Sequence, residues 1–174
     1  MTATPIPRSL CLTAFGDLDL TMIRDLPPGR RAVMTQRIIS REQQQRAWDF
    51  LRKQLRAGRQ AYIVCPRVES ESATARDAAA TKVYEYLQRT ELAGLRLALV
   101  HGQMDRRERA EIMDRYREHA LDVLVATTVV EVGVDVPNAT LMVILQAERF
   151  GLAQLHQLRG RVARGVHQGY CFLF

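Results

Sequence analysis

Three arginines stand close together near the end of the chain, in the stretch HQLRGRVARG. Arg159, Arg161 and Arg164 alternate there with two glycines, Gly160 and Gly165. A guanidinium is planar, permanently charged and able to donate paired hydrogen bonds to phosphate oxygens, and glycine lets the backbone approach a ligand closely. The stretch therefore predicts a surface that binds a polyphosphate. A solvated basic helix end is the alternative, because arginine-rich turns are common on protein surfaces.

The composition is that of one globular domain with a basic surface. The chain has 174 residues, a hydrophobic content of 47%, a net charge of +6 and a pI near 9.7. This charge balance favours an anionic partner such as nucleic acid. No apolar run reaches the ~18 residues that a membrane span needs, and no charged-then-apolar leader opens the chain. We therefore expect a cytoplasmic protein without a membrane partner.

The cysteines and histidines do not form the patterns of a disulfide framework or a metal site. Cys11, Cys65 and Cys171 are odd in number, far apart and in apolar surroundings. Such cysteines favour buried, reduced thiols. The four histidines are not paired with cysteines or carboxylates at ligand spacing, so the sequence predicts no metal site.

The first part of the chain differs from the rest. A short helix is predicted at 9–15 and a strand at 18–23, and the stiff segment LPPGR follows at 26–30. The strand has no partner nearby in the sequence. We therefore assign 1–30 to the remnant and linker of a neighbouring domain, and 31–174 to a domain of its own.

Strand and helix patterns alternate after this linker. A capping box at Ser40 and Gln43 starts a long helix that Gly58 stops. Further helices are predicted at 76–90 and 106–117, and strands at 33–39, 61–65, 97–100, 123–126, 141–145 and 170–174. The residues expected to face the core are Trp48, Leu51, Leu55, Val83, Tyr86, Leu87, Ile112, Met113 and Tyr116.

This alternation indicates an α/β fold in which helices cover both faces of a mostly parallel sheet. Ligands of such sheets bind at the carboxyl ends of the strands. We expect the loops 66–72, 101–105 and 127–137 to lie at that edge, together with the arginine stretch.

Four stretches in a fixed order resemble the second motor domain of superfamily 2 helicases, most closely the RecG-type branched-DNA helicases. They read MTATPIPRSL with GDLD, LVHGQMDRRER, VLVATTVVEVGVDVPNAT, and AERFGLAQLHQLRGRVARG. The resemblance implies a RecA-like three-layer domain of the P-loop NTPase type. Transcription-repair coupling translocases share several of these stretches, whereas GDLD followed by LPPGR is closer to RecG.

The resemblance implies an ATP-facing set of residues. Arg161 and Arg164 match the arginine fingers that reach the γ-phosphate, and Gln157 would align their helix with ATP. Gly133 and Asp135 match positions near the ribose and the cleft. ATP and Mg²⁺ are the implied cofactors, and the first motor domain would bind most of both.

A second set of residues matches family positions that contact DNA. Thr127, Thr128, His101 and Gly102 each follow or end a predicted strand, where hydroxyl and backbone N–H groups can meet phosphates without reading sequence. Arg109 matches an arginine that either braces these loops or touches a ligand. Branched or duplex DNA is the implied partner.

Residue by residue, simpler explanations exist. Thr127 and Thr128 could cap a helix, Gly133 could supply a turn, and Asp135 could be an ordinary turn acid. The joint arrangement of the motifs argues for the functional roles.

The resemblance also shows what the whole enzyme would need from elsewhere. Thr2, Ala3 and Thr4 match the motif that couples nucleotide state to DNA movement at the end of the first motor domain. The chain contains no G-x-x-x-x-G-K-[ST] loop and no acidic strand end for magnesium. It should therefore be inactive alone and act with the wedge and first motor domain of the same polypeptide. A transcription-repair translocase and a non-catalytic nucleic-acid-binding module are the alternative functions.

Overall fold

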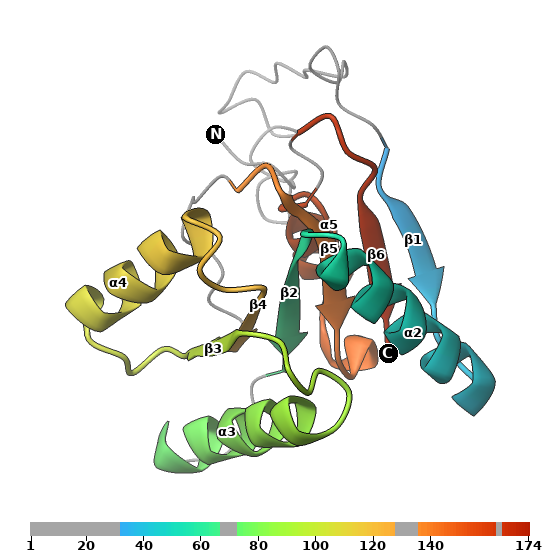
Figure 1. Cartoon of the computed structure of the whole chain (residues 1–174). Helices are drawn as coiled ribbons and strands as arrows, with labels where there is room; N and C mark the ends of the chain where they lie inside the picture. The colour runs from blue at the N-terminus through green and yellow to red at the C-terminus, as the bar shows by residue number, and fades with distance from the viewer. Residues whose placement is uncertain (1–31, 67–72, 128–135, 163–164) are drawn as a thin grey trace, which may run out of the picture.

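One parallel sheet organises the domain (Figure 1). The computed structural model describes residues 32–66, 73–127, 136–162 and 165–174. Their strands are β1 (Met34–Arg37), β2 (Gln60–Cys65), β3 (Leu97–Val100), β4 (Val123–Thr127), β5 (Ala139–Ile144) and β6 (Tyr170–Leu173). The order in the sheet is β1-β6-β5-β2-β4-β3, and every neighbouring pair is parallel. The predicted α/β fold is therefore confirmed.

Helices cover both faces of this sheet. They are α2 (Arg41–Arg56), α3 (Ala73–Arg89), α4 (Arg106–Arg117) and α5 (Leu152–Arg159), and a short 3₁₀ turn, η1 (Ala147–Arg149), precedes α5. Buried side chains of α2 and α3 belong to one core cluster, and those of α4 and α5 belong to the other. The domain thus has three layers, with the sheet in the middle.

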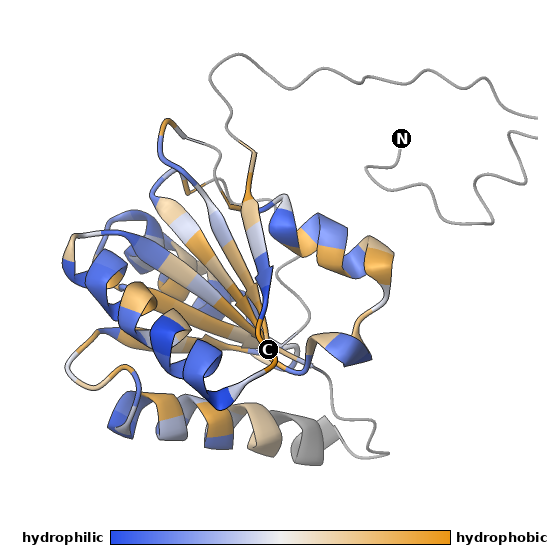
Figure 2. Ribbon diagram, turned by 90° about the vertical axis from the view of Figure 1, so that its right-hand side faces the viewer, coloured by the Kyte–Doolittle hydropathy of each residue, from blue (hydrophilic) through white to orange (hydrophobic). Residues whose placement is uncertain are grey.

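The central strands are buried on both sides, as the apolar runs in the sequence predict. β2, β4 and β5 are buried along their whole length. In β2, Tyr62 and Val64 point to the α4 and α5 side, whereas Ala61 and Ile63 point to the α2 and α3 side. In Figure 2 these strands are mostly in the hydrophobic colour, whereas the helices combine hydrophilic and hydrophobic segments. β1, at the end of the sheet, is exposed along its length.

The predicted capping box at the start of α2 is present. The Gln43 N–H donates to Ser40 Oγ at 3.2 Å, and the Ser40 N–H donates to Gln43 Oε1 at 3.2 Å. Two orphan N–H groups of the first turn are satisfied in this way. The helix ends at Arg56, and Gly58 has a left-handed φ of 84°. The predicted core residues of this helix are all buried: Trp48, Leu51 and Leu55.

The predicted inward face of α3 is wrong at one residue. Leu87 is buried and Val83 packs against the core, but Tyr86 is 57% exposed. Tyr84 takes the inward place, and its hydroxyl donates to the Leu97 carbonyl at 3.4 Å. The helix also begins at Ala73, three residues before the predicted start. The alanine-rich first turns carry a weak apolar stripe, so the pattern did not fix the helix rotation.

α4 has the predicted bounds, whereas the hydrophobic pattern did not predict α5. Met113 and Tyr116 of α4 are buried, as expected. In α5, Leu158 is buried but Leu152 is 85% exposed. A helix that buries so little of its surface has almost no apolar stripe, which explains why it was missed.

Two of the three cysteines can be described. Cys65 and Cys171 are buried and carry free thiols. Burial raises the pKa of each thiol to about 12, although the charge of Arg159 acts in the opposite direction on Cys171. Both thiols are therefore protonated and unreactive at neutral pH. Cys11 lies outside the described residues. Within those ranges, no helix has the length and apolar character to cross a membrane.

Candidate functional site

Three of the four predicted DNA-binding residues lie at the carboxyl edge of neighbouring strands. β3 and β4 are paired in parallel, with Val100 opposite Ala126. His101 and Gly102 continue from β3, and Thr127 ends β4, so the pairing of these two strands brings the residues together. Thr128 lies outside the described residues.

This carboxyl edge is open at Gly102. The residue is exposed, and a methyl group added to its α-carbon would meet no heavy atom within 4 Å. Thr127 is only 7% exposed, and His101 is half-buried. The backbone of Gly102 can therefore be approached by a bulky anion such as a DNA phosphate, while its neighbours are held in the fold.

Arg109 of α4 braces the turn that carries these residues. Its Nη2 donates to the carbonyl oxygens of His101, Gly102 and Met104, at 3.4, 3.2 and 3.2 Å. Its Nε is buried and has no hydrogen-bond partner among the described residues. Of the two roles open to this arginine, these contacts support bracing, because the guanidinium fixes three carbonyls of one turn.

The arginine stretch lies at the opposite edge, so the prediction that it shares an edge with the DNA-binding loops is wrong. α5 leaves the carboxyl end of β5 and returns the chain to the amino end of β6. A methyl group at Gly165 would lie 3.1 Å from the carbonyl oxygen of Pro137, which stands just before β5. The stretch forms the end of α5 and the turn after it, and the eight residues of this helix lead the chain about 12 Å back along the sheet.

Two of the predicted ATP-facing residues lie together at this amino edge. Gln157 is exposed in the last turn of α5, and Arg161 follows the helix with a half-exposed side chain. The Arg161 N–H donates to the Leu158 carbonyl at 3.0 Å, and the next residue, Val162, is fully buried. Arg161 therefore projects from a firmly anchored turn. The other proposed ATP and coupling residues lie outside the described residues: Gly133, Asp135, Arg164, Thr2, Ala3 and Thr4.

The two glycines of this stretch have identifiable roles in the fold. Gly160 caps α5 with an ordinary φ of −69°. The close approach at Gly165 is to Pro137, since an added methyl would also lie 3.3 Å from the Pro137 Cβ. At Gly165 the close neighbour is thus the chain itself, whereas the approach of a ligand to the backbone of Gly160 stays a prediction.

A residue that the sequence did not single out also lies at the amino edge. Asn138 follows Pro137, and its side chain hydrogen-bonds to Gly58 and Arg59 in the turn between α2 and β2. The sequence feature that could have pointed to Asn138 is a polar residue between a proline and an apolar strand. That signal is too common to identify a site by itself.

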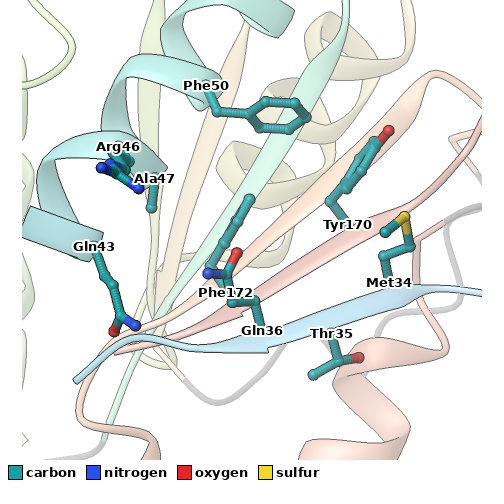
Figure 3. A pocket seen from close by; sticks show the side chains of 9 residues that line it. All are labelled: Met34, Thr35, Gln36, Gln43, Arg46, Ala47, Phe50, Tyr170 and Phe172. Carbon is teal, nitrogen blue, oxygen red and sulfur yellow. The ribbon is translucent and has the colours of Figure 1, made fainter. Parts of the chain in front are cut away.

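A groove elsewhere on the domain contains none of the predicted site residues. It has a volume of about 570 Å³ and lies between α2 and the strands β1 and β6 (Figure 3). Phe50 packs against Tyr170 and Phe172 in its wall, with ring centroids 4.8 and 5.9 Å apart. Within the described ranges, no cluster of three or more His, Cys, Asp or Glu residues could hold a metal ion.

Comparison with known proteins supplies the family. The profile of the helicase conserved C-terminal domain matches residues 43–166. The chain belongs to this family. Over 99% of its length it is 48% identical to the ATP-dependent DNA helicase RecG of Synechocystis sp. and 47% identical to that of Thermotoga maritima. It covers 21% and 22% of those two proteins, so it spans about a fifth of their length.

Solved structures agree with this assignment. A structure of RecG bound to a three-way DNA junction is 46% identical and matches 98% of this chain, with a TM-score of 0.76. The chain covers 22% of that RecG chain. Domain 2 of the DEAD-box helicase Mss116p matches with a TM-score of 0.58 at 21% identity, which shows the shared fold. The RecG-type resemblance and the RecA-like fold are thus confirmed.

Proposed function

We propose that this chain is the second motor domain of a RecG-type, ATP-dependent DNA helicase that remodels branched DNA such as stalled forks and Holliday junctions. The observation that carries the proposal is the identity of 46–48% to RecG proteins over almost the whole chain. The alternatives, a transcription-repair translocase and a non-catalytic binding module, have no comparable support here.

In this proposal the domain works as one half of a motor. Residues 31–174 form the RecA-like domain, and 1–30 are the remnant and linker of the first motor domain. The motif Thr2-Ala3-Thr4 couples nucleotide state to DNA movement. The wedge and the first motor domain of the same polypeptide are its intramolecular partners, and the cytoplasm is its location.

The amino edge faces ATP. Arg161 and Arg164 donate to the γ-phosphate and stabilise the negative charge that develops during its transfer to water. Gln157 aligns α5 with the nucleotide, and Gly133 and Asp135 lie near the ribose. The position of Arg161, a half-buried residue on an anchored turn, supports this assignment. Mg²⁺, like most of the ATP, is assigned to the first motor domain by the family resemblance, and the described residues contain no group of three or more His, Cys, Asp or Glu that could hold it.

The carboxyl edge holds DNA. The backbone at Gly102 and the hydroxyls of Thr127 and Thr128 bind phosphates, together with His101, and such contacts position the duplex without reading its sequence. The open space at Gly102 supports this role. The two ligands thus contact opposite edges of one rigid sheet, so a movement of this domain on ATP hydrolysis displaces the bound DNA.

The test is DNA-stimulated ATPase activity of the complete polypeptide carrying Arg161→Ala or Arg164→Ala. Loss of a finger should lower kcat by about 10³-fold, while the Kd for a branched duplex stays close to that of the unmodified enzyme. Arg46→Ala, which removes an equal charge from the exposed face of α2, should change neither quantity. Unchanged turnover in both finger variants would refute the assignment of Arg161 and Arg164 as arginine fingers.

A further inference from the structure

The turn that carries Arg161 packs against the segment just before β5. Val162, one residue after Arg161, is fully buried, and it shares a core cluster with Val136 and Leu158. Gly165 packs closely against Pro137, so a methyl group there would fit only if Pro137 moved by a few tenths of an ångström. The position of Arg161 therefore depends on where residues 136–138 lie.

Asn138 fixes that segment to two other turns of the amino edge. Its Oδ1 accepts from Arg59 Nη1 at 3.0 Å, and its Nδ2 donates to the Gly58 carbonyl at 2.8 Å. The same NH₂ group lies 3.3 Å from His119 Nδ1, in the turn between α4 and β4. The guanidinium can only donate and the carbonyl can only accept, so these two partners define the orientation of the amide.

A buried glutamine extends this network into the core. Gln60 is 2% exposed, and its Oε1 lies 3.3 Å from Asn138 Nδ2. Its Nε2 donates to the carbonyls of Tyr116 and Leu121 at 2.6 and 2.8 Å. The Gln60 N–H also donates to the Asn138 carbonyl at 3.1 Å. Three turns that are distant in the sequence are therefore joined through one amide.

We propose that Asn138 is a positioning residue for ATP hydrolysis. It locks residues 136–138, on which the turn of Arg161 is seated, and so holds the Arg161 guanidinium in place for the phosphate. This inference rests on the proposed function, because it concerns how the same arginine is aimed. Misplacing a catalytic group by about 1 Å can cost roughly a hundredfold in rate, so a lock remote from the ligand can affect turnover strongly.

The test is Asn138→Asp in the complete polypeptide. The substitution keeps the size of the side chain but replaces the NH₂ donor, so that an oxygen faces the Gly58 carbonyl. We expect kcat for DNA-stimulated ATP hydrolysis to fall by about tenfold to a hundredfold. The KM for ATP and the Kd for branched DNA should stay within about twofold, because the ligand contacts themselves are retained. Asn138→Ala, which removes the whole amide, should give the same pattern.

Asp122→Asn is the matched control. Asp122 pairs with Arg96 at the amino edge next to β3 and β4, away from β5 in the sheet. The Asp122→Asn substitution should lower the melting temperature without changing kcat for DNA-stimulated ATP hydrolysis. An equal loss of kcat in Asp122→Asn and Asn138→Asp would overturn the proposal, since general loosening of the edge would then suffice. A kcat of Asn138→Asp within about twofold of the unmodified enzyme would overturn it as well.

Arg161→Ala, measured in parallel, separates this inference from the proposed function. If Arg161→Ala abolishes turnover and Asn138→Asp does not, only the positioning role fails. If Arg161→Ala retains turnover, the finger assignment fails, and the positioning role that depends on it fails with it.

Discussion

The two edges of the sheet are built in opposite ways. At the carboxyl edge, Gly102 faces open space, and the Arg109 guanidinium holds the turn by donating to the backbone carbonyl oxygens of that turn. At the amino edge, Gly165 is pressed against Pro137, and Asn138 ties the neighbouring turns together by its side chain. The carboxyl edge thus leaves backbone free for a ligand, whereas the amino edge uses its backbone for packing and presents side chains.

This difference suits the ligands that we assign to each edge. A duplex has many equivalent phosphates, so exposed backbone and hydroxyl groups can bind it in any sequence. A departing γ-phosphate requires a guanidinium at one defined place, so the backbone that carries the arginine must be held rigidly. The same residue type, glycine, consequently has a different function at each edge.

The largest effect that distinguishes the two edges should be on DNA affinity, when threonine is replaced by valine at each edge in turn. Thr127→Val removes a hydroxyl from the carboxyl edge and keeps the side-chain shape. Loss of a hydrogen bond to a charged phosphate should weaken binding of branched DNA by about tenfold, equally for all sequences. Fluorescence anisotropy at several salt concentrations would measure the Kd and its salt dependence.

The matched control is Thr140→Val, since Thr140 is also buried but lies at the amino end of β5. It should leave the Kd for DNA unchanged. A sequence-selective loss in Thr127→Val would contradict phosphate binding at the carboxyl edge. Equal losses in the two variants would remove the distinction between the edges.

Alanine at the two glycines should give a difference of similar size, measured in stability. Gly165→Ala places a methyl 3.1 Å from a carbonyl oxygen and should lower the free energy of unfolding by about 1–3 kcal/mol. Gly102→Ala enters open space and should change it by less than about 0.5 kcal/mol, while DNA affinity falls because the methyl occupies the path of the phosphate. Urea denaturation would measure the free energy of unfolding, and DNA titration would measure the affinity. A Gly165→Ala variant as stable as the unmodified protein would show that the contact between Gly165 and Pro137 is not tight.

The two edges also differ in how far the sequence predicts them. Apolar runs and the capping box at Ser40 predicted the strands and α2, because local pattern and burial agree there. The carboxyl edge followed directly, since a residue just after a parallel strand must lie at that edge. His101, Gly102 and Thr127 were therefore placed together correctly.

The amino edge was not predicted because its contacts join distant turns. Asn138 contacts Gly58 and His119, which no local pattern connects. The arginine stretch was assigned to the wrong edge because α5, which reverses the chain, has too small an apolar face to be recognised. Turns that meet only through long-range hydrogen bonds require the tertiary structure.

Arg109 allows a smaller test of the carboxyl edge. Arg109→Lys keeps the charge, but a single ammonium cannot span the three carbonyls that the guanidinium reaches. We expect a loss of about 1 kcal/mol in unfolding free energy and a modest loss of DNA affinity. ATP affinity should be unchanged, because the amino edge is untouched. A change in the KM for ATP without a change in DNA affinity would show that Arg109 acts on the amino edge and would contradict its role at the carboxyl edge.

The smallest effect should be the pH dependence of one ion pair at the amino edge. Asp122 accepts hydrogen bonds from the Arg96 guanidinium and N–H, at 2.6 to 3.1 Å. Partial burial alone would raise the pKa of Asp122, but these bonds outweigh it, so the pKa lies below its ordinary value. At low pH, protons therefore bind the unfolded chain more readily than the folded chain. The ion pair stabilises the fold fully above the ordinary carboxyl pKa, and this stabilisation is lost as the pH falls through the pKa of the folded state.

The melting temperature of the unmodified chain should exceed that of Asp122→Asn by a constant margin between about pH 5 and 7, and the margin should shrink below about pH 4. Glu42→Gln, in a well exposed pair with Arg46, should show no such margin, so a margin of equal size there would indicate a general charge effect.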